Sequence, residues 1–542
     1  MPLDAAALGR ALGAAPPEVH HQLCRRQIDR LRAAAASGEE LLVACTQEAP
    51  LFAMTVGGDG PPLAVVNIRE RAGWSDQAGQ ATPKIAALLA EAAVEIPPAT
   101  AVATRSQGRC LVLGDGEVAL EAARRLAERL DVTLLLTGPS TLLPPDRDAF
   151  PIHAGTILRG RGHLGAYVVE AEQLQVMAVS SRDRVRLEPW QDRATLEADL
   201  ILDLRGGTPL FTAHARRDGY LRAEPADALA VERALFDATG LVGAFEKPRH
   251  VLFDAALCAH SRSRRTGCTR CLDQCPTGAI TPAGDHVAID PWVCAGCGAC
   301  AGVCPTGAAA YASPSAEALL RRLRSLLGTY LDAGGEAPVL LVHEERHGGA
   351  LIAAMARLGR GLPARVLPFA VPEIALLGFE FLAGALALGA AELVVLVPPA
   401  KGAEVAGLDA TAGVVRALLD GLGHDGARLL VVSEDDPDRL EAQLWSMAVR
   451  PPPPRGDFVP LGGKPALSFT GSPRVHSIGS LCPRVRRSAR SRSMLPAARC
   501  ASPASAPAPP ARCSTIPTCQ CCASSRTRAS SAACAAPPAP SR

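Results

Sequence analysis

Eight of the chain's 18 cysteines fall within one short segment, and their spacing is typical of metal ligands. They form two groups of four, which are Cys258, Cys268, Cys271 and Cys275, then Cys294, Cys297, Cys300 and Cys304. Cysteines two residues apart direct their sulfur atoms to one side of a tight turn, and soft thiolates bind iron–sulfur clusters or zinc. A reducing compartment keeps such thiols available to a metal. Redox-metal chemistry is therefore the first hypothesis.

The later four cysteines have the complete spacing of a bacterial [4Fe–4S] motif, in which the fourth cysteine is followed by proline. In paired motifs the fourth cysteine ligates the neighbouring cluster. The predicted ligands are Cys258, Cys268, Cys271 and Cys304 for cluster 1, and Cys294, Cys297, Cys300 and Cys275 for cluster 2. Because both predicted clusters lie in one short segment, we expect single electrons to pass from one to the other. A pair of zinc knuckles is the alternative, because paired cysteines also bind Zn²⁺.

The earlier four cysteines depart from this motif, because nine residues separate Cys258 from Cys268 where the motif has two. A long loop can still return the leading cysteine to the cluster. The inserted loop contains four residues that can carry positive charge, which are His260, Arg262, Arg264 and Arg265. Positive charge beside a cluster would raise its reduction potential or contact an acidic partner. A solvated loop is the simpler interpretation.

The cysteine segment resembles the two-cluster bacterial ferredoxin. The sequences CPTGAI (residues 275–280) and CPTGAA (residues 304–309) correspond to the two pseudo-twofold halves of that domain. The resemblance implies a small ferredoxin-like α+β cluster module, which we assign to residues 251–312.

Two α/β regions are predicted before the cysteine module. Residues 1–100 form a small α/β region with strands at Leu41–Thr46 and Leu63–Ile68. From Arg109 the sequence CLVLGDGEVALEAARRLAERLDVTLLL predicts a strand, a glycine-rich turn, a helix and a second strand. A further strand is predicted at Ala198–Leu204. This pattern predicts a degenerate Rossmann-like domain over residues 101–250.

The glycine-rich turn resembles a dinucleotide-binding fingerprint, because Gly114, Gly116 and Ala119 match GxGxxA. Two acids, Asp115 and Glu117, lie where phosphate groups would bind, and no acid follows the second strand to hold a ribose. We therefore expect no FAD to co-purify in stoichiometric amount. A flavoenzyme that uses residues 101–250 for FAD and the clusters as an internal wire remains the alternative.

Three further stretches resemble the A subunit of heterodisulfide reductase, a flavin and iron–sulfur electron-transfer protein. They are ACTQEAPLF (44–52), VVNIRERAGWS (65–75) and HAGTILRGRGHLGAYVV (153–169). The resemblance implies a Rossmann-like scaffold for the N-terminal part. Cys45, in the first stretch, is interpreted as a small core residue within a strand.

Residues 313–449 are predicted to form a doubly wound α/β domain. A basic amphipathic helix, Ala316–Leu331, precedes four apolar strands that alternate with helices. The segment resembles the delta subunit of methyl-viologen-reducing hydrogenase, but it lacks the loop cysteines that hold a metal cluster in that family. VHEERHGG (342–349) and VPPAKGAE (397–404) occupy those loops, and Glu344, Glu345 and His347 are expected at the surface. We interpret it as a docking or structural domain.

Residues 450–542 are predicted to be a proline-rich linker and a disordered tail. From Pro465 onward the tail has 11 basic residues and no acidic ones. We hypothesise that a frameshift just after Lys464 produced this tail. If the reading frame is moved one base earlier, an alanine codon (GCN) that follows a T is read as TGC, which encodes cysteine. Alanines then fall at ferredoxin spacing in two runs, which are Ala498, Ala501, Ala504 and Ala508, and Ala529, Ala532, Ala535 and Ala539. On this hypothesis the seven tail cysteines are not ligands.

Charge and hydropathy exclude several other classes of protein. Subtracting the tail leaves 45 basic and 54 acidic residues in residues 1–464, so the body carries a charge of −9 and no nucleic acid binding is expected. The most apolar stretch, Ile374–Ala391, contains Glu380 and runs into LVVLV, which favours a buried helix and strand over a membrane span. No secretory signal is visible at the N-terminus, so we expect a cytoplasmic protein.

The predicted function is electron transfer through two [4Fe–4S] clusters, to or from a partner oxidoreductase such as a formate dehydrogenase. No catalytic residue can be assigned, so an electron carrier or oxidoreductase subunit is favoured over an autonomous enzyme. The alternatives are the FAD-dependent oxidoreductase described above and a zinc-stabilised interaction protein.

Overall fold

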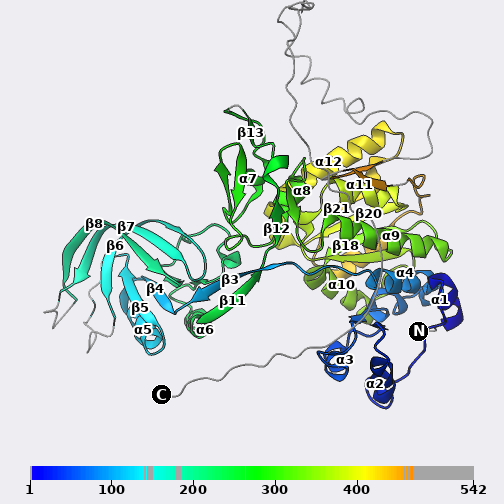
Figure 1. Ribbon diagram of the computed structural model, residues 1–542, viewed down its shortest axis with the longest axis horizontal. Helices are drawn as coiled ribbons and strands as arrows, with labels where there is room; N and C mark the ends of the chain where they lie inside the picture. Colours follow the sequence, from blue (N-terminus) through cyan, green and yellow to red (C-terminus); the bar gives the residue numbers. More distant parts are fainter. Residues whose placement is uncertain are drawn as a thin grey trace, which may run out of the picture. The chain divides into compact units, whose positions relative to one another are not determined.

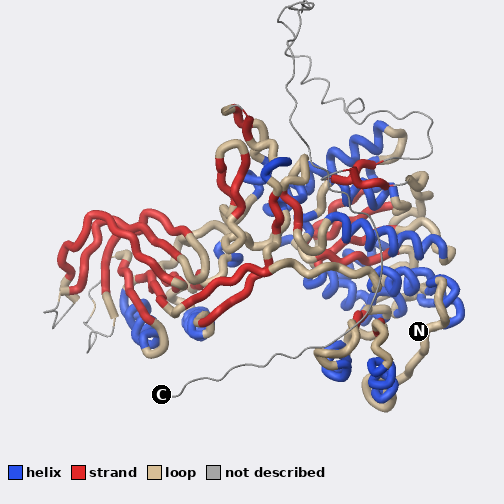
Figure 2. Tube along the Cα trace, in the orientation of Figure 1, coloured by secondary structure: helices blue, strands red, loops and turns tan. Residues whose placement is uncertain are grey.

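The computed structural model describes residues 3–138, 142, 150–178, 185–262, 264–456, 458–461 and 464–467. Within these ranges the chain is a mixed α/β protein, as predicted, with parallel and antiparallel strand pairs. Figure 2 shows helices and strands in the described parts of the chain. Within the predicted linker and tail, β22 (Phe458–Leu461) and β23 (Lys464–Leu467) form a short antiparallel pair. The predictions of disorder and of a frameshift for residues 468–542 lie outside the described residues.

The first hundred residues contain four helices and a small two-stranded sheet. The elements are α1 (Ala5–Leu12), α2 (Ile28–Ala36), β1 (Leu41–Val43), α3 (Ala49–Val56), β2 (Leu63–Val65) and α4 (Thr82–Ala92). Strands β1 and β2 pair in parallel, and Leu31, Val43 and Phe52 form a small core beside them. Cys45 packs against this core, but it follows β1 rather than lying within a strand, so that part of the prediction is wrong.

The next region is built on a seven-stranded sheet with the order β10-β9-β4-β5-β6-β7-β8. Neighbouring strands from β10 to β6 are parallel, and β6, β7 and β8 pair antiparallel. The strands are β4 (Arg109–Gly114), β5 (Asp131–Leu136), β6 (Ile152–Arg161), β7 (Tyr167–Met177), β8 (Leu187–Ala198), β9 (Leu200–Leu204) and β10 (Tyr220–Arg222). Helices α5 (Gly116–Ala127) and α6 (Ala228–Thr239) share a core with the apolar side chains of one face.

The antiparallel strand β8 was not predicted from the sequence. Most of its residues are exposed, and Trp190 is 47% exposed. An edge strand that is exposed to solvent on both faces has no alternation of apolar and polar residues, so it is hard to recognise as a strand from the sequence. Two other strands, β3 (Ala101–Ser106) and β11 (Gly243–Pro248), pair antiparallel away from the main sheet.

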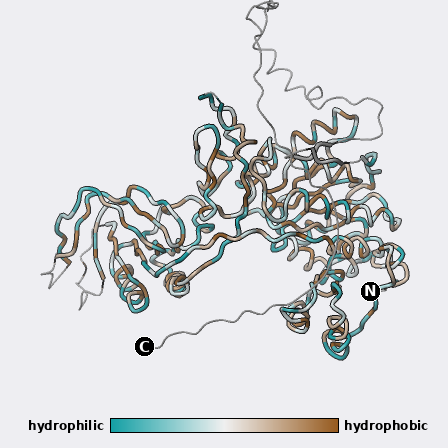
Figure 3. The backbone as a smooth tube through the Cα atoms, viewed as in Figure 1, coloured by the Kyte–Doolittle hydropathy of each residue, from teal (hydrophilic) through white to brown (hydrophobic). Residues whose placement is uncertain are grey.

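The C-terminal region contains the four predicted strands, and all four are parallel. They are β18 (Val339–Glu344), β19 (Val366–Val371), β20 (Glu392–Val397) and β21 (Leu429–Ser433), in the order β19-β18-β20-β21. Helices α10 (Glu345–Leu358) and α13 (Pro437–Ser446) pack on one face. Helices α9 (Ala316–Asp332), α11 (Phe379–Ala387) and α12 (Ala406–Gly421) pack on the other. Figures 1 and 3 show these apolar strands enclosed by helices.

Helix α4 belongs to the same hydrophobic core as this C-terminal sheet. Ile85 and Leu88 of α4 are buried in one cluster with Leu323 and Leu327 of α9. At the edge of this contact Arg322 of α9 donates to the carboxylate of Glu91. Segments that are more than 200 residues apart in the sequence, α4 and α9, therefore stabilise each other.

The stretch Ile374–Ala391 is divided into a short 3-10 turn and helix α11, and strand β20 follows it. Among the described residues, no helix combines the length and apolar character needed to cross a bilayer.

Lys84 of α4 is fully buried, and its ammonium donates hydrogen bonds to the carbonyl oxygens of Leu362 and Pro363, at 3.5 and 2.8 Å. Burial lowers the pKa of Lys84 from 10.5 to about 7. The unfolded chain then binds one more proton than the folded chain between these two values. The free energy of unfolding therefore rises with pH across that window, by roughly 4 kcal/mol for this group.

We expect the variant Lys84→Met to lose this pH dependence, because methionine has no proton to release. Guanidinium unfolding of both proteins at pH 7 and at pH 10 measures it. The stability of the wild type relative to the variant should increase on going to pH 10. Equal changes in both proteins would contradict the assignment.

Candidate metal centre

The cysteine module contains two short helices that each end directly at a Cys-Pro-Thr-Gly turn. Helix α7 (Arg270–Gln274) precedes Cys275, and α8 (Ala299–Val303) precedes Cys304. In both turns the threonine hydroxyl lies 3.7 Å from the cysteine Sγ two residues earlier. The following glycines, Gly278 and Gly307, have φ values of 67° and 76°. Thus the two halves repeat one local structure.

Short strands connect and frame these turns. They are β12 (Val251–Phe253), β13 (Ser261–Arg262), β14 (Arg265–Thr266), β15 (Ile280–Ala283), β16 (His286–Ile289) and β17 (Ala309–Tyr311). Strand β12 pairs with β17, β13 with β14, and β15 with β16, each time antiparallel. The first and last strands of the module therefore meet, which closes the segment around its cysteines.

Four thiols line one small cavity in this module. They belong to Cys258, Cys268, Cys271 and Cys304, and we call them the first thiol set. Burial and, to a smaller extent, the thiols of the other three members raise the pKa of Cys271 to about 11. The long loop after Cys258 is folded back by hydrogen bonds to His260, whose Nδ1 lies 2.9 Å from the Cys268 carbonyl oxygen. This loop brings Cys258 into the set despite its unusual spacing.

The other four cysteines form a second thiol set, which is Cys275, Cys294, Cys297 and Cys300. Burial raises the pKa of Cys300 well above its usual value, followed by the thiols of the other three members and then by Cys271 of the first set. Burial also raises the pKa of Cys297 to about 11, although the backbone N–H of Ala299 and the guanidinium of Arg216 act in the opposite direction. Cys275 lies with the later cysteines, and Cys304 lies with the earlier ones.

The donor chemistry of both sets fits iron–sulfur clusters. Each set offers four sulfur atoms in a largely apolar setting, with buried Val251, Ile280 and Val287 around them. Backbone N–H groups point at sulfur, as at Cys304, whose Sγ accepts from Ala309 at 3.5 Å. Such donors stabilise negative charge on a ligating thiolate. No group of three or more His, Cys, Asp or Glu side chains in the described ranges is placed to hold a single metal ion.

Gly298, between Cys297 and Cys300, is required by its surroundings. Its φ is +75°, and a Cβ atom there would lie 2.5 Å from the Cβ of Leu376. We expect Gly298→Ala to destabilise the protein by roughly 1 to 3 kcal/mol and to lower metal content, because both strain and contact disturb the second thiol set.

Thermal unfolding and iron analysis test this expectation, with Gly334→Ala as the matched control. Gly334 has a φ of +83°, but a Cβ atom there would meet nothing within 4 Å. The control therefore carries the backbone strain without the contact. Equal losses of stability and metal in the two variants would show that the contact with Leu376 has no effect.

Two consecutive arginines from the seven-stranded sheet region approach the second thiol set, and the sequence analysis did not identify them. Arg217 donates to the carbonyl oxygen of Thr277 at 2.6 Å and to that of Gly162 at 2.8 Å. Its guanidinium lies 4.3 Å from the ring centroid of Phe211. Among the described residues, Arg217 has no carboxylate partner, and its Nε has no hydrogen-bond acceptor.

Arg216 differs from Arg217 because it is neutralised by carboxylates of the C-terminal region. It donates to Glu404 at 2.7 Å and to Glu373 at 3.4 Å. Lys401 bridges Glu373 to Glu344, with distances of 2.7 and 2.8 Å. Glu344 is thus buried in an ion-pair network, and its expected place at the surface is wrong.

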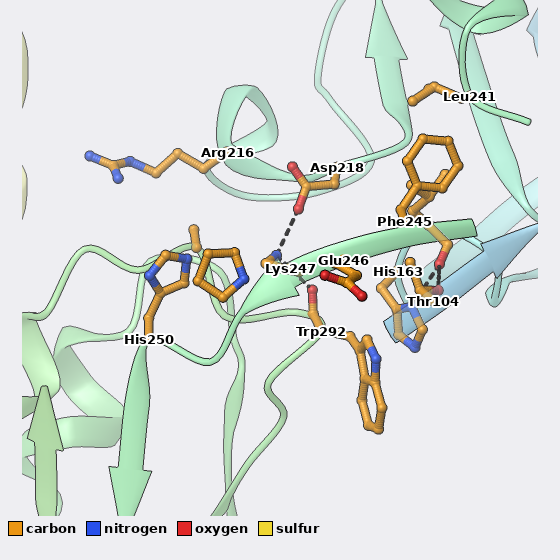
Figure 4. A pocket seen from close by; sticks show the side chains of 13 residues that line it. Thr104, His163, Arg216, Asp218, Leu241, Phe245, Glu246, Lys247, His250 and Trp292 are labelled. Atoms are coloured by element: carbon orange, nitrogen blue, oxygen red, sulfur yellow. Dashed lines mark hydrogen bonds and ion pairs between the residues drawn. The ribbon is translucent and has the colours of Figure 1, made fainter. Parts of the chain in front are cut away.

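A cavity of about 500 Å³ lies beside the second thiol set and is lined by Ala295 and Trp292 from the loop that carries Cys294. Figure 4 shows Lys247 within this lining, with its ammonium on the Asp218 carboxylate at 2.7 Å. The ring of His163 is stacked on Trp292, with centroids 5.4 Å apart. The charged lining residues Lys247 and Asp218 therefore neutralise each other.

The glycine-rich turn lies far along the chain from these cysteines. Gly114 ends β4, Gly116 begins α5 with a φ of 68°, and a Cβ on Gly114 would lie 2.9 Å from that of Ala119. The Asp115 carboxylate accepts hydrogen bonds from the backbone N–H groups of Thr137 and Gly138, at 3.1 and 2.6 Å. This carboxylate, which follows β4, binds two donors that follow the neighbouring parallel strand β5, and its negative charge lies in the turn where a dinucleotide phosphate would bind.

We therefore keep the prediction that no FAD co-purifies, and denaturation of the purified chain followed by flavin fluorescence tests it. One tightly bound FAD per chain would contradict it. The dinucleotide-like role of Gly114, Gly116 and Ala119 stays a prediction as well.

One comparison with known proteins concerns the cysteine module. Residues 264–308 match the family model described as a 4Fe-4S dicluster domain. This range contains seven of the eight cysteines, since Cys258 precedes it. A search of curated proteins finds no match to the chain. The dicluster match supports an iron–sulfur, electron-transfer role for this protein.

Proposed function

We propose that the chain relays single electrons through two [4Fe–4S] clusters to or from a partner oxidoreductase. The observation that carries the proposal is the division of eight thiols into two sets of four, within a segment that matches a dicluster domain. The first thiol set would hold one cluster and the second set the other. Bound clusters supply reversible one-electron oxidation and reduction.

The protein residues control the environment of each thiol set. Apolar side chains and the closed strand pairs limit access of water, and backbone N–H groups compensate charge on sulfur. Each half of the module supplies the cysteine of its Cys-Pro-Thr-Gly turn to the thiol set of the other half. Both halves are therefore needed to complete either set. Electrons can then pass between the sets without a large rearrangement of the chain.

The α/β regions on either side act as structural and docking parts in this proposal. Their contacts with the module are polar in part, as between Arg217 and Thr277, and apolar in part, as between Ala299 and the cluster that contains Leu376. The partner in this proposal is an oxidoreductase of the formate dehydrogenase type. The proposed location is the cytoplasm, because a reducing compartment keeps thiols available for metal. The chain would then be a subunit or carrier rather than a complete enzyme.

The visible absorption spectrum of the full chain, purified without oxygen, tests the proposal. A broad absorption that bleaches on reduction is expected of iron–sulfur clusters, and an electron paramagnetic resonance signal should appear on one-electron reduction. A structured flavin spectrum would favour the flavoenzyme. A colourless protein that contains zinc would overturn the proposal in favour of a zinc-stabilised interaction protein.

A further inference from the structure

The loop between Cys258 and Cys268 forms a small exposed hairpin. Strands β13 and β14 pair there, with Arg262 opposite Arg265. Its base is closed by the N–H of Gly267, which donates to the carbonyl oxygen of His260 at 2.7 Å. Figure 1 shows β13 at the tip of the module, beyond α7. The described residues on either side of the turn are therefore paired as strands.

Four arginines are gathered on and beside this hairpin. All four are exposed, and we call them the arginine patch, which is Arg262, Arg264, Arg265 and Arg270. No ion pair joins any of them to a carboxylate in the part of the chain that the structure describes. Many surface arginines elsewhere are paired with a carboxylate, as Arg125 is with Glu232, whereas four unpaired ones lie together here. The patch is therefore a local excess of positive charge on a body that carries −9.

The arginine patch lies at the first thiol set. Arg270 lines the same cavity as Cys258, Cys268, Cys271 and Cys304, and the hairpin joins two of these cysteines. Leu257, next to Cys258, is 41% exposed and offers an apolar contact.

The second thiol set is packed against other regions of the chain on one side. Each set has one buried cysteine, Cys300 at 7% and Cys304 at 8% exposure, but beside the second set Gly298 and Gly302 also face Leu376 and Ala375 of the C-terminal region. Arg216 and Arg217, from the region of the seven-stranded sheet, lie next to this set: Arg216 acts on the Cys297 thiol, and Arg217 donates to the carbonyl oxygen of Thr277. Of the two sets, the first is therefore the one that other regions of the chain cover less.

From this arrangement we infer that the arginine patch is the docking surface for a small acidic electron-carrier protein of the ferredoxin type. Arginine side chains bind carboxylates with paired hydrogen bonds, and unpaired surface charge steers an oppositely charged protein to its site. With a cluster held by the first thiol set, the reduced carrier would be oxidised by one electron and that cluster reduced by one, with no bond made or broken. The inference deepens the proposed function and rests on it.

Stopped-flow electron transfer tests the inference. The probe is a reduced acidic ferredoxin, mixed with the full chain carrying its clusters, at low salt and at 0.5 M KCl. We expect the second-order rate constant to fall at least about tenfold in high salt, because surface attraction is screened. The triple variant Arg262→Glu, Arg264→Glu, Arg265→Glu should lose about as much at low salt and become nearly insensitive to salt.

Two controls separate docking from damage. Arg129→Glu changes an exposed arginine on the sheet region and should keep the wild-type rate. Replacing the three hairpin arginines with glutamine should give an intermediate rate, with unchanged iron content in every variant. A triple variant with full iron content and the wild-type rate and salt dependence would overturn the inference, as would faster reaction with a basic carrier such as cytochrome c.

Calorimetric binding of the oxidised ferredoxin distinguishes this inference from the proposed function. Clusters without ferredoxin binding would contradict the docking surface and leave the relay standing. A chain without iron would contradict the relay itself.

Discussion

Replacing Cys297 with alanine should reduce the iron content of the chain from about eight atoms to about four, as expected for the loss of one of two cubanes. Cys297 belongs to the second thiol set, and its three partners alone leave one corner of the cubane without a protein ligand. The first set shares no cysteine with it, so its iron should be largely retained. Iron and sulfide analysis of variant and wild type, purified without oxygen, measures the change.

Cys45→Ala is the matched control for this experiment. Cys45 is a half-buried thiol that packs on a core formed by Leu31, Val43 and Phe52, away from the cysteine module. Its removal should leave about eight irons. Loss of all iron from Cys297→Ala would show that the two sets do not assemble independently.

Cys258 tests the assignment of ligands rather than the number of clusters. The structure lines one cavity with Cys258 and the rest of the first set, although the chain reaches it through a long loop. If Cys258→Ala retains both clusters in full, the ligand set is wrong at this position. The cluster ligands as a whole stay a prediction until these variants are made.

Arg217→Gln should lower the reduction potential of the second set by about 60 mV or more. Burial lowers the pKa of Arg217, while Asp290 and the Cys275 thiol oppose this, so the guanidinium lies close to a predicted ligand. A half-buried cation without a carboxylate partner is costly unless an anion lies nearby. A thiolate-ligated cluster is such an anion, and its reduced form carries more negative charge. About 1.4 kcal/mol of attraction corresponds to about 60 mV for one electron.

Potentiometric titration followed by electron paramagnetic resonance measures this potential. Arg217→Lys keeps the charge and should recover most of it, whereas a purely structural role would not respond to charge. Arg222→Gln is the control, since Arg222 contacts Gly207 and Glu224 instead. Unchanged potentials in Arg217→Gln would contradict the charge-compensating role.

Much of the fold is predictable from the sequence where the hydrophobic pattern is strong. The four parallel strands between 339 and 433 each contain a continuous apolar run, as buried parallel strands usually do, and all were predicted. By contrast, β8 is a wet edge strand with no such pattern. The contact of α4 with α9 depends on tertiary packing between distant segments, which a single sequence does not reveal.

The candidate site, like the fold, is predictable from the sequence only in part. Cysteine spacing and the repeated CPTG sequence identify the eight thiols, because local geometry dictates them. Arg216 and Arg217 carry no local signal, since their function depends on the sheet region meeting the module. Burial of Glu344 is equally non-local, because Lys401 compensates its charge from another loop.

The amounts of iron, acid-labile sulfide and zinc in the full chain, purified without oxygen, test the central claim most directly. Two cubanes predict about eight irons and eight sulfides per chain, with zinc near zero. One or two zinc ions per chain and no sulfide would contradict the electron relay and show that the eight cysteines hold structural metal.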